Sequence, residues 1–318
     1  MIDDEFKHKP VLINEVIESI EPADDKIYFD ATFGNGGYSK KILSSSNCKV
    51  IAIDRDPSVS SKAKEFEEKY KDRFKFIESR FSQIKKVMEE LEREKVNCFL
   101  FDIGVSSMQL DNANRGFSFM KDGPLDMRMS NTGKTAGELI NTIDQNELAD
   151  ILFHYGDERN SRRIAKSIIN YRNKKEIKST LELADIIKKN NKNFKSKINP
   201  ATKTFQALRM FINNELEELH SGLNQALNLL SIAGKICVVT FHSLEDRMVK
   251  NFSKALGSSV KVEKVIKPSD DEVRLNPRSR SAKLRLIQKI SNQNKYIPIE
   301  ECGLAYDFKN IKDFFNCF

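Results

Sequence analysis

The chain has 318 residues, of which 39% are hydrophobic and 31% charged, with a formal net charge of +7. This length suits one large domain or two modest ones. No apolar run approaches the roughly 20 residues of a membrane helix, and the acidic start MIDDEFKHKP is no signal peptide. Five cysteines without a CxxC pair and four scattered histidines argue against disulfides and zinc. We therefore expect a cytoplasmic protein with no metal site.

The positive charge is concentrated in one segment. Residues 159–203 hold 14 Lys or Arg and 3 Asp or Glu, a net charge of +11, so the rest of the chain has a net charge of −4. Two interpretations fit this surplus: a lysine-rich, solvated surface, or an electrostatic footprint for nucleic acid. If the second holds, binding should fall steeply with salt.

The stretch 27–39, IYFDATFGNGGYS, is typical of a strand, a tight turn and the start of a helix. Glycine allows positive φ and leaves no Cβ between backbone and ligand. The helix that follows offers unpaired N–H groups. Together they predict the nucleotide-binding turn of a doubly wound α/β fold. Because Ser39 replaces the third glycine of G-x-G-x-x-G, a plain βα turn remains an alternative.

Alternating segments after this turn predict a parallel sheet with helical crossovers. Further strands are expected at 49–54, 74–78, 96–104 and 235–241, with late strands near VEKVIK and KLRLIQKI. Residues 105–135 carry no strand signal. From Phe205 to Leu230, apolar residues step by three and four, which predicts one long amphipathic helix. The fold class is α/β with an inserted helical domain: a discontinuous sheet domain, 1–110 and 206–318, and an insertion, 111–205.

Acidic residues end three of the expected strands. Asp54 follows Gly34 by 20 residues, the place of a ribose-binding carboxylate. Asp30 and Asp102 end neighbouring strands, and three like charges would repel a pyrophosphate. They suit S-adenosylmethionine, which carries a ribose, an ammonium and a sulfonium. Phe81, just past the third strand, is either an adenine-stacking side chain or a core aromatic.

Two long stretches resemble a known family. They are FDIGVSSMQLDNANRGFSFMKDGPLDMRM at 101–129 and TFHSLEDRMVK at 240–250. Shorter motifs agree: HKPVL, DATFGNGGYS, AIDRDP, NPATKTFQALRM and NPRSRSAKLR. The sequence is similar, from His8 to about Ile290, to the bacterial small-subunit ribosomal RNA cytosine-N4 methyltransferases, the RsmH (MraW) family.

The resemblance implies a Rossmann-like methyltransferase sheet with an inserted, RNA-facing helical domain. It implies S-adenosylmethionine as cofactor, and a cytosine of the decoding region in small-subunit (16S) ribosomal RNA as target, in naked RNA or in the 30S subunit. A homodimer is left open. The family's cofactor contacts fall on Gly36, Gly37, Tyr38, Asp54, Phe81, Asp102 and Gln109.

The sequence departs from the family pattern at several positions. Tyr38 and Asn199 stand where His is usual, and Lys203 where Arg is usual. Tyr38 is compatible with cofactor binding if the contact runs through its backbone N–H. Lys203 lacks the planar fork that Arg offers a phosphate, which puts an RNA contact there in doubt.

The chemistry requires in-line placement of nucleophile and methyl group, and an acceptor for the amino proton. The [DN]PP[YF] element of many amino methyltransferases is absent, and that position reads DIGV. Asp102 and His242 are the catalytic candidates. Asp102 is equally a cofactor ligand, and His242 is equally a structural histidine.

Two further points stay open. Residues 105–129 are either a mobile cover, flexing at Gly116 and Gly123 with Arg128 meeting a phosphate, or a fixed, packed loop.

Competing functions are a DNA amino methyltransferase, a nucleotide-dependent oxidoreductase and a non-catalytic RNA-binding or assembly protein. Residues 291–318 lie beyond the family match and carry no functional prediction.

Overall fold

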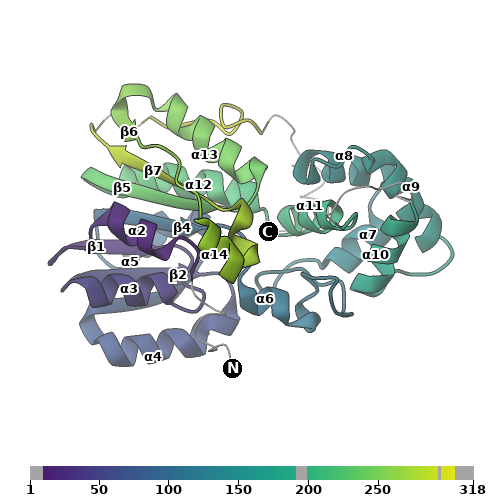
Figure 1. Cartoon of the computed structure of the whole chain (residues 1–318), viewed down its shortest axis with the longest axis horizontal. Coiled ribbons are helices and arrows are strands. Elements are labelled where there is room, and N and C mark those ends of the chain that lie inside the picture. The colour runs from purple at the N-terminus through teal and green to yellow at the C-terminus, as the bar shows by residue number, and fades with distance from the viewer. Residues whose placement is uncertain (1–9, 191–198, 293–294, 305–318) are drawn as a thin grey trace. The chain divides into compact units, whose positions relative to one another are not determined.

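The computed structural model describes residues 10–190, 199–292 and 295–304. These residues form two compact units. The sheet unit comprises residues 10–104 and 216–304, and the helical unit comprises residues 105–215 (Figure 1). The domain limits expected from the sequence remain a prediction, because compactness does not test which part recognises substrate.

The sheet unit contains one seven-stranded sheet in the order β3-β2-β1-β4-β5-β7-β6. Strands β1 to β5 run parallel, and β7 runs antiparallel between β5 and β6. The strands are β1 Ile27–Asp30, β2 Lys49–Asp54, β3 Phe74–Glu78, β4 Val96–Asp102, β5 Leu230–Thr240, β6 Val260–Val262 and β7 Lys283–Lys289. The chain reverses direction across the sheet between β1 and β4, the switch point where α/β sheets bind ligands. The Rossmann-like α/β class predicted from the sequence is confirmed.

Helices cover both faces of this sheet. Right-handed crossovers place α3 and α4 on one face, where α2 lies beside α3 (Figure 1). The crossovers place α5, α12 and α13 on the other, and Ser82 and Lys85 bind side chains of α12 there. The helices of this unit are α2 Ile13–Ile20, α3 Gly37–Ser45, α4 Ser60–Tyr70, α5 Ile84–Glu90, α12 Glu215–Leu229, α13 Ser243–Ala255 and α14 Asp270–Leu275.

The sheet's interior is filled by aromatic and branched side chains. Phe29 and Phe99, on the paired strands β1 and β4, have ring centroids 5.0 Å apart. Both are fully buried. Central parallel strands covered on both faces need such continuous apolar runs. The polar residues of these strands therefore collect at their ends, which is what positions the site.

The helical unit is a packed set of short helices. They are α6 Ser107–Asp111, α7 Ala136–Thr142, α8 Gln145–Gly156, α9 Ser161–Arg172, α10 Thr180–Lys189 and α11 Thr202–Ile212. Polar caps begin several of them: the side chains of Thr135, Asp144 and Ser179 each accept a backbone N–H of the first turn. Exposed basic residues on α9 and α10 carry much of the charge surplus. Three of its lysines lie in 191–198, outside the described residues.

Four expected elements differ in the structure. The long helix predicted from Phe205 to Leu230 is two helices, α11 and α12, separated at Asn213 and Asn214. Asn214 has φ +50, which no α-helix accommodates. Strand β4 ends at Asp102, two residues early, and β5 begins at Leu230 rather than 235. The strand expected near VEKVIK lies at Val260–Val262, so it overlaps that segment only at Val262, which pairs with Ile287 of β7, and Ile266 adds an isolated bridge to Leu284.

The cysteines that the structure describes, Cys48, Cys98, Cys237 and Cys302, are buried free thiols. Within the described ranges, no helix is both long and apolar enough to cross a membrane.

Candidate functional site

The turn between β1 and α3 has the backbone that its glycines predict. Gly34 and Gly36 have φ +51 and +73, and α3 begins at Gly37. A Cβ on Gly36 would lie 2.5 Å from the Phe66 ring, and one on Gly37 would lie 2.3 Å from Cγ of Pro10. The absence of side chains here is therefore required by packing within the protein, whatever ligand the turn holds.

Two acids tie this turn to the sheet. Asp30 is fully buried and accepts the Ser39 hydroxyl at 2.6 Å and the Thr32 N–H at 3.1 Å. Asp54 accepts the Gly34 N–H at 2.8 Å through Oδ2 and the Asp56 N–H at 2.9 Å through Oδ1. Burial raises the pKa of each carboxyl to about 6. Asp30 thus fixes the turn, whereas each oxygen of Asp54 keeps a lone pair for another donor.

Asp102 is the least satisfied acid at this edge. Its backbone N–H donates to the Thr32 hydroxyl at 2.8 Å, which joins the end of β4 to the glycine turn. Its Oδ1 is buried and accepts no hydrogen bond from any residue that the structure describes. Burial, followed by repulsion from Asp30 and Glu245, raises the pKa of Asp102 to about 8. A buried carboxylate oxygen without a donor is costly, and a cationic or hydrogen-bonding ligand would relieve the cost.

The two aromatic candidates sit against the protein interior. The Tyr38 side chain is buried, and its hydroxyl donates to the carbonyl of Val11. Its backbone N–H lies in the first turn of α3, where helical N–H groups have no intrahelical acceptor. Phe81 packs edge-on against Phe101, with ring centroids 5.3 Å apart, and keeps part of its surface exposed. Phe81 therefore packs as a core aromatic, and its stacking on adenine stays a prediction.

Gln109 belongs to the helical unit. It is buried, and it forms a capping box with Ser106: the Gln109 Oε1 accepts the Ser106 N–H at 3.0 Å, and the Ser106 Oγ accepts the Gln109 N–H at 3.2 Å. This arrangement fixes the start of α6. Its cofactor contact stays a prediction.

The loop of residues 105–135 is packed rather than open. A Cβ on Gly116 would lie 2.2 Å from the Pro124 carbonyl oxygen, and one on Gly123 would lie 1.9 Å from that of Ala113. These two glycines therefore allow backbone segments to cross closely. Arg128 donates to both carboxylate oxygens of Asp126 at 2.8 Å, so its guanidinium is already engaged. The structure favours the fixed-loop interpretation.

Lys203 and Asn199, which depart from the family pattern, also serve local structure. The Lys203 ammonium donates to the carbonyl of Asp157 at 2.8 Å, just past the end of α8. The Asn199 side chain accepts the Ala201 N–H at 3.0 Å.

His242 precedes α13 at the carboxyl end of β5, and an acidic residue holds it. Its Nε2 lies 2.9 Å from Oε1 of Glu245, whose side chain is 1% exposed, against 15% for His242. The other oxygen of Glu245 accepts the Phe241 N–H at 3.0 Å. The imidazole is thereby oriented with its Nε2 toward the carboxylate.

The sequence reasoning missed Glu245 and its neighbour Asp246. Asp246 binds Arg285 and Lys283 of β7, each at 2.6 Å. Burial would raise the pKa of Asp246, but the hydrogen bonds from these two cations outweigh it and lower the pKa. The signal that could have found Glu245 is its spacing: residues i and i+3 lie on one helix face.

Comparisons with known proteins identify the family. A sequence model of the MraW methylase family matches residues 5–290. The chain belongs to the MraW methylase family. It is 51% identical over 291 residues to the Ribosomal RNA small subunit methyltransferase H of Wolbachia sp. subsp. Drosophila simulans, a match covering 89% of this chain and 99% of that one. The protein of the same name from Ehrlichia canis is 51% identical over 296 residues, covering 89% and 100%.

Solved structures resemble the chain more distantly. An rRNA methylase from Streptococcus thermophilus aligns with a TM-score of 0.43 at 11% identity, over 92% of this chain and 99% of that one.

The sheet unit has groups that fit the cofactor of a methylase. Donors are present at the start of α3, acceptor capacity remains on Asp54, and the unsatisfied oxygen of Asp102 suits a cation. Among the residues that the structure describes, no group of three His, Cys, Asp or Glu side chains is placed to hold a metal ion.

Proposed function

We propose that this protein transfers a methyl group from S-adenosylmethionine to the N4 amino group of a cytosine in the decoding region of small-subunit ribosomal RNA. Family membership supports methyl transfer, and the names of relatives about half identical over nearly their whole length support the RNA class. The main structural support for the proposal is the buried Oδ1 of Asp102, which lies beside the glycine turn and accepts no hydrogen bond from the described residues. It is a site prepared for a positively charged ligand.

The cofactor would be held by the sheet unit's own groups. When bound, S-adenosylmethionine supplies an electrophilic methyl group on a sulfonium. We assign the ribose to Asp54, one adenine face to Phe81, and backbone contacts to Gly36, Gly37 and Tyr38. The Gly36 N–H already donates to the Phe33 carbonyl at 2.7 Å, so the backbone donors are those of Gly37 and Tyr38. Asp102 would balance the positive charge, and Gln109 is proposed from family position.

Asp102 and His242 are the proposed acceptors for the amino proton. With a pKa of about 8, Asp102 is mostly neutral near pH 7 and must ionise before it can accept a proton. The Nε2 of His242 lies 2.9 Å from the Glu245 carboxylate, which orients the ring as a general base should be oriented. The pair with Glu245 favours His242 as the proton acceptor and Asp102 as the cofactor ligand.

The proposed substrate is the RNA within the 30S subunit, in the cytoplasm. The basic surface of the helical unit supports a nucleic-acid partner. Base chemistry requires the cytosine to leave its stack.

The test is methyl transfer from labelled S-adenosylmethionine to three substrates: 30S subunits, naked 16S RNA and duplex DNA. We expect label in RNA, on a single cytosine, by mass spectrometry of nuclease fragments. Asp102→Asn should weaken cofactor binding, whereas His242→Ala should lower kcat and leave cofactor binding intact. Methylation of DNA alone, or full turnover by both variants, would contradict the proposal.

A further inference from the structure

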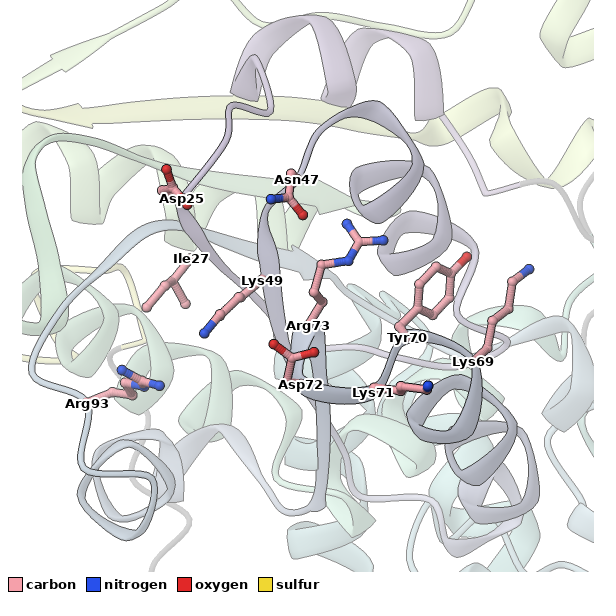
Figure 2. Close-up of a pocket in the computed structure, with 10 residues that line it drawn as sticks. All are labelled: Asp25, Ile27, Asn47, Lys49, Lys69, Tyr70, Lys71, Asp72, Arg73 and Arg93. Carbon is pink, nitrogen blue, oxygen red and sulfur yellow. The ribbon is translucent and has the colours of Figure 1, made fainter.

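A second hollow lies at the opposite edge of the sheet, where the strands begin. It has a volume of about 610 Å³ and belongs wholly to the sheet unit. Its wall includes Ile27 and Lys49, the first residues of β1 and β2. The other lining residues are Asp25, Asn47, Lys69, Tyr70, Lys71, Asp72, Arg73 and Arg93 (Figure 2). We call it the amino-edge pocket.

The amino-edge pocket is strongly basic. Five of its ten lining residues are Lys or Arg and two are Asp. Figure 2 shows Lys69 and Lys71 on one side, Lys49 and Arg93 on the other, and Asp72 between them. Within the described residues, none of these four cations lies within ion-pair distance of a carboxylate. Neighbouring lysines outside the pocket do pair, as Lys75 does with Glu67 at 2.9 Å.

Local structural needs do not account for these cations. Helix C-termini meet at this edge and favour positive charge. Arg73 meets that need at the end of α3, where it donates to the Leu43 and Ser46 carbonyls at 3.2 and 3.1 Å. The side chains of Lys49, Lys71 and Arg93 donate to no carbonyl in the described part of the chain. Four cations brought together without a carboxylate partner among the described residues point to an anionic ligand.

The pocket offers charge but no surface for a nucleobase. Tyr70 is its aromatic residue, and its ring is already in contact with Phe66, at a centroid distance of 5.5 Å. The Lys69 ammonium and the Arg73 guanidinium lie 5.3 and 5.8 Å from the same ring. Base stacking needs an uncovered face. The lining lysines are exposed, which suits contacts to phosphates of a strand rather than tight enclosure of a nucleotide.

We propose that the amino-edge pocket is a second RNA contact, which binds backbone phosphates of the substrate away from the target base. This inference rests on the proposed function for the identity of the RNA. Lys49 and Asp54 lie at opposite ends of β2, about 17 Å apart at the usual rise per residue. The pocket therefore acts on substrate affinity and not on the cofactor or the transferred methyl group.

The test compares two triple variants that remove the same charge. Lys49→Gln/Lys71→Gln/Arg93→Gln empties the pocket of three cations. The matched control, Lys62→Gln/Lys75→Gln/Lys85→Gln, removes three exposed lysines of the same unit that pair with Glu65, Glu67 and Glu89. Affinity for 16S RNA and for 30S subunits is measured as a function of salt, together with cofactor affinity, thermal stability and kcat at saturating substrate.

We expect the pocket variant to bind RNA at least tenfold more weakly at 0.1 M salt, with the salt slope reduced by about 2–3, since each phosphate contact contributes about 0.7–0.9. Cofactor affinity, thermal stability and kcat should match wild type. Equal RNA affinity in the two triple variants would overturn the inference.

Pyrophosphate and ATP are used as competitors to separate a small-anion site from an RNA site. Binding of either to wild type but not to the pocket variant, with RNA affinity equal in both, would overturn the RNA assignment. RNA binding that depends on the pocket in a protein that methylates no RNA would refute the proposed function alone. Normal methylation with no effect of the pocket variant would refute this inference alone.

Discussion

At the scale of single residues, environment decides what each acid does. Asp30, Asp54 and Asp102 end three adjacent strands, yet they differ in the hydrogen bonds that their carboxylate oxygens accept. Asp30 and Asp54 accept two hydrogen bonds each, whereas the buried Oδ1 of Asp102 accepts none from the described residues. Of these three carboxylates, Asp102 is therefore the one with a buried oxygen that lacks a donor among the described residues.

The raised pKa of Asp102 predicts pH-dependent cofactor binding. Because the ionised form attracts the cationic cofactor and the pKa is about 8, affinity should rise as pH increases from 6 to 8, by at most tenfold per unit. Calorimetry in buffers of different ionisation enthalpy should detect proton release on binding. Asp102→Asn should bind weakly with little pH dependence, and an unchanged pH profile in that variant would refute the assignment.

Glu245 is predicted to be a positioning residue that acts through His242. Glu245→Gln keeps the size of the side chain but removes the charge facing Nε2. We expect kcat to fall about 10–100-fold while cofactor affinity stays unchanged, and the ¹⁵N resonances of the His242 ring to shift. Glu245→Asp should recover part of the loss. A purely structural role would instead lower thermal stability and leave kcat and the ring resonances unaltered.

At the scale of elements, glycine and asparagine set the helical unit's connections. Asn213, just past α11, accepts the Met129 N–H at 2.7 Å and donates to the Met127 carbonyl at 2.7 Å. These bonds attach the loop to the helix break, and Met127 itself has φ +61. The loop is therefore held by specific polar contacts as well as by packing.

Gly123→Ala should destabilise the helical unit by about 2–3 kcal/mol, because the new Cβ meets the Ala113 carbonyl oxygen. Gly257→Ala is the control: Gly257 has φ +56 and nothing within 4 Å of its ideal Cβ, so it reports only the conformational cost, about 1 kcal/mol. Urea unfolding and hydrogen exchange at residues 113–125 measure the difference. If both variants lose the same unfolding free energy, the loop can shift to accommodate the new Cβ at little cost.

At the scale of the whole molecule, the buried acids predict how stability varies with pH. Folding raises the pKa of Asp30 and Asp54 to about 6 and that of Asp102 to about 8, from 3.8. The folded state therefore binds protons more readily than the unfolded state. The stability that these three acids add to the folded state is fully present below about pH 4. It is lost as the pH rises through 6, where Asp30 and Asp54 ionise, and then through 8, where Asp102 ionises.

The melting temperature of the cofactor-free protein should accordingly fall between pH 5.5 and 8.5. Asp102→Asn should flatten the upper part of that range, between pH 7 and 8. A melting temperature that stays constant across the range would show that these acids ionise as readily in the folded protein as in the unfolded chain.

The sequence alone determined the family, the α/β class and the acids at the carboxyl edge. These follow from local signals: an apolar run marks a central strand, and a polar residue at its end marks the edge where ligands bind. Gly34 and Gly36 were likewise readable, because positive φ is a local property.

Only the tertiary structure decided the rest. The periodicity from Phe205 to Leu230 continues across the break at Asn213, because both helices bury apolar faces and the pattern carries no record of the break. The amino-edge pocket depends on which distant segments the sheet brings together: residues 25–27, 47–49, 69–73 and 93 share one hollow only because β1 and β2 pair and α4 and α5 end beside them. Contacts between residues so far apart in the chain leave no local pattern in its sequence.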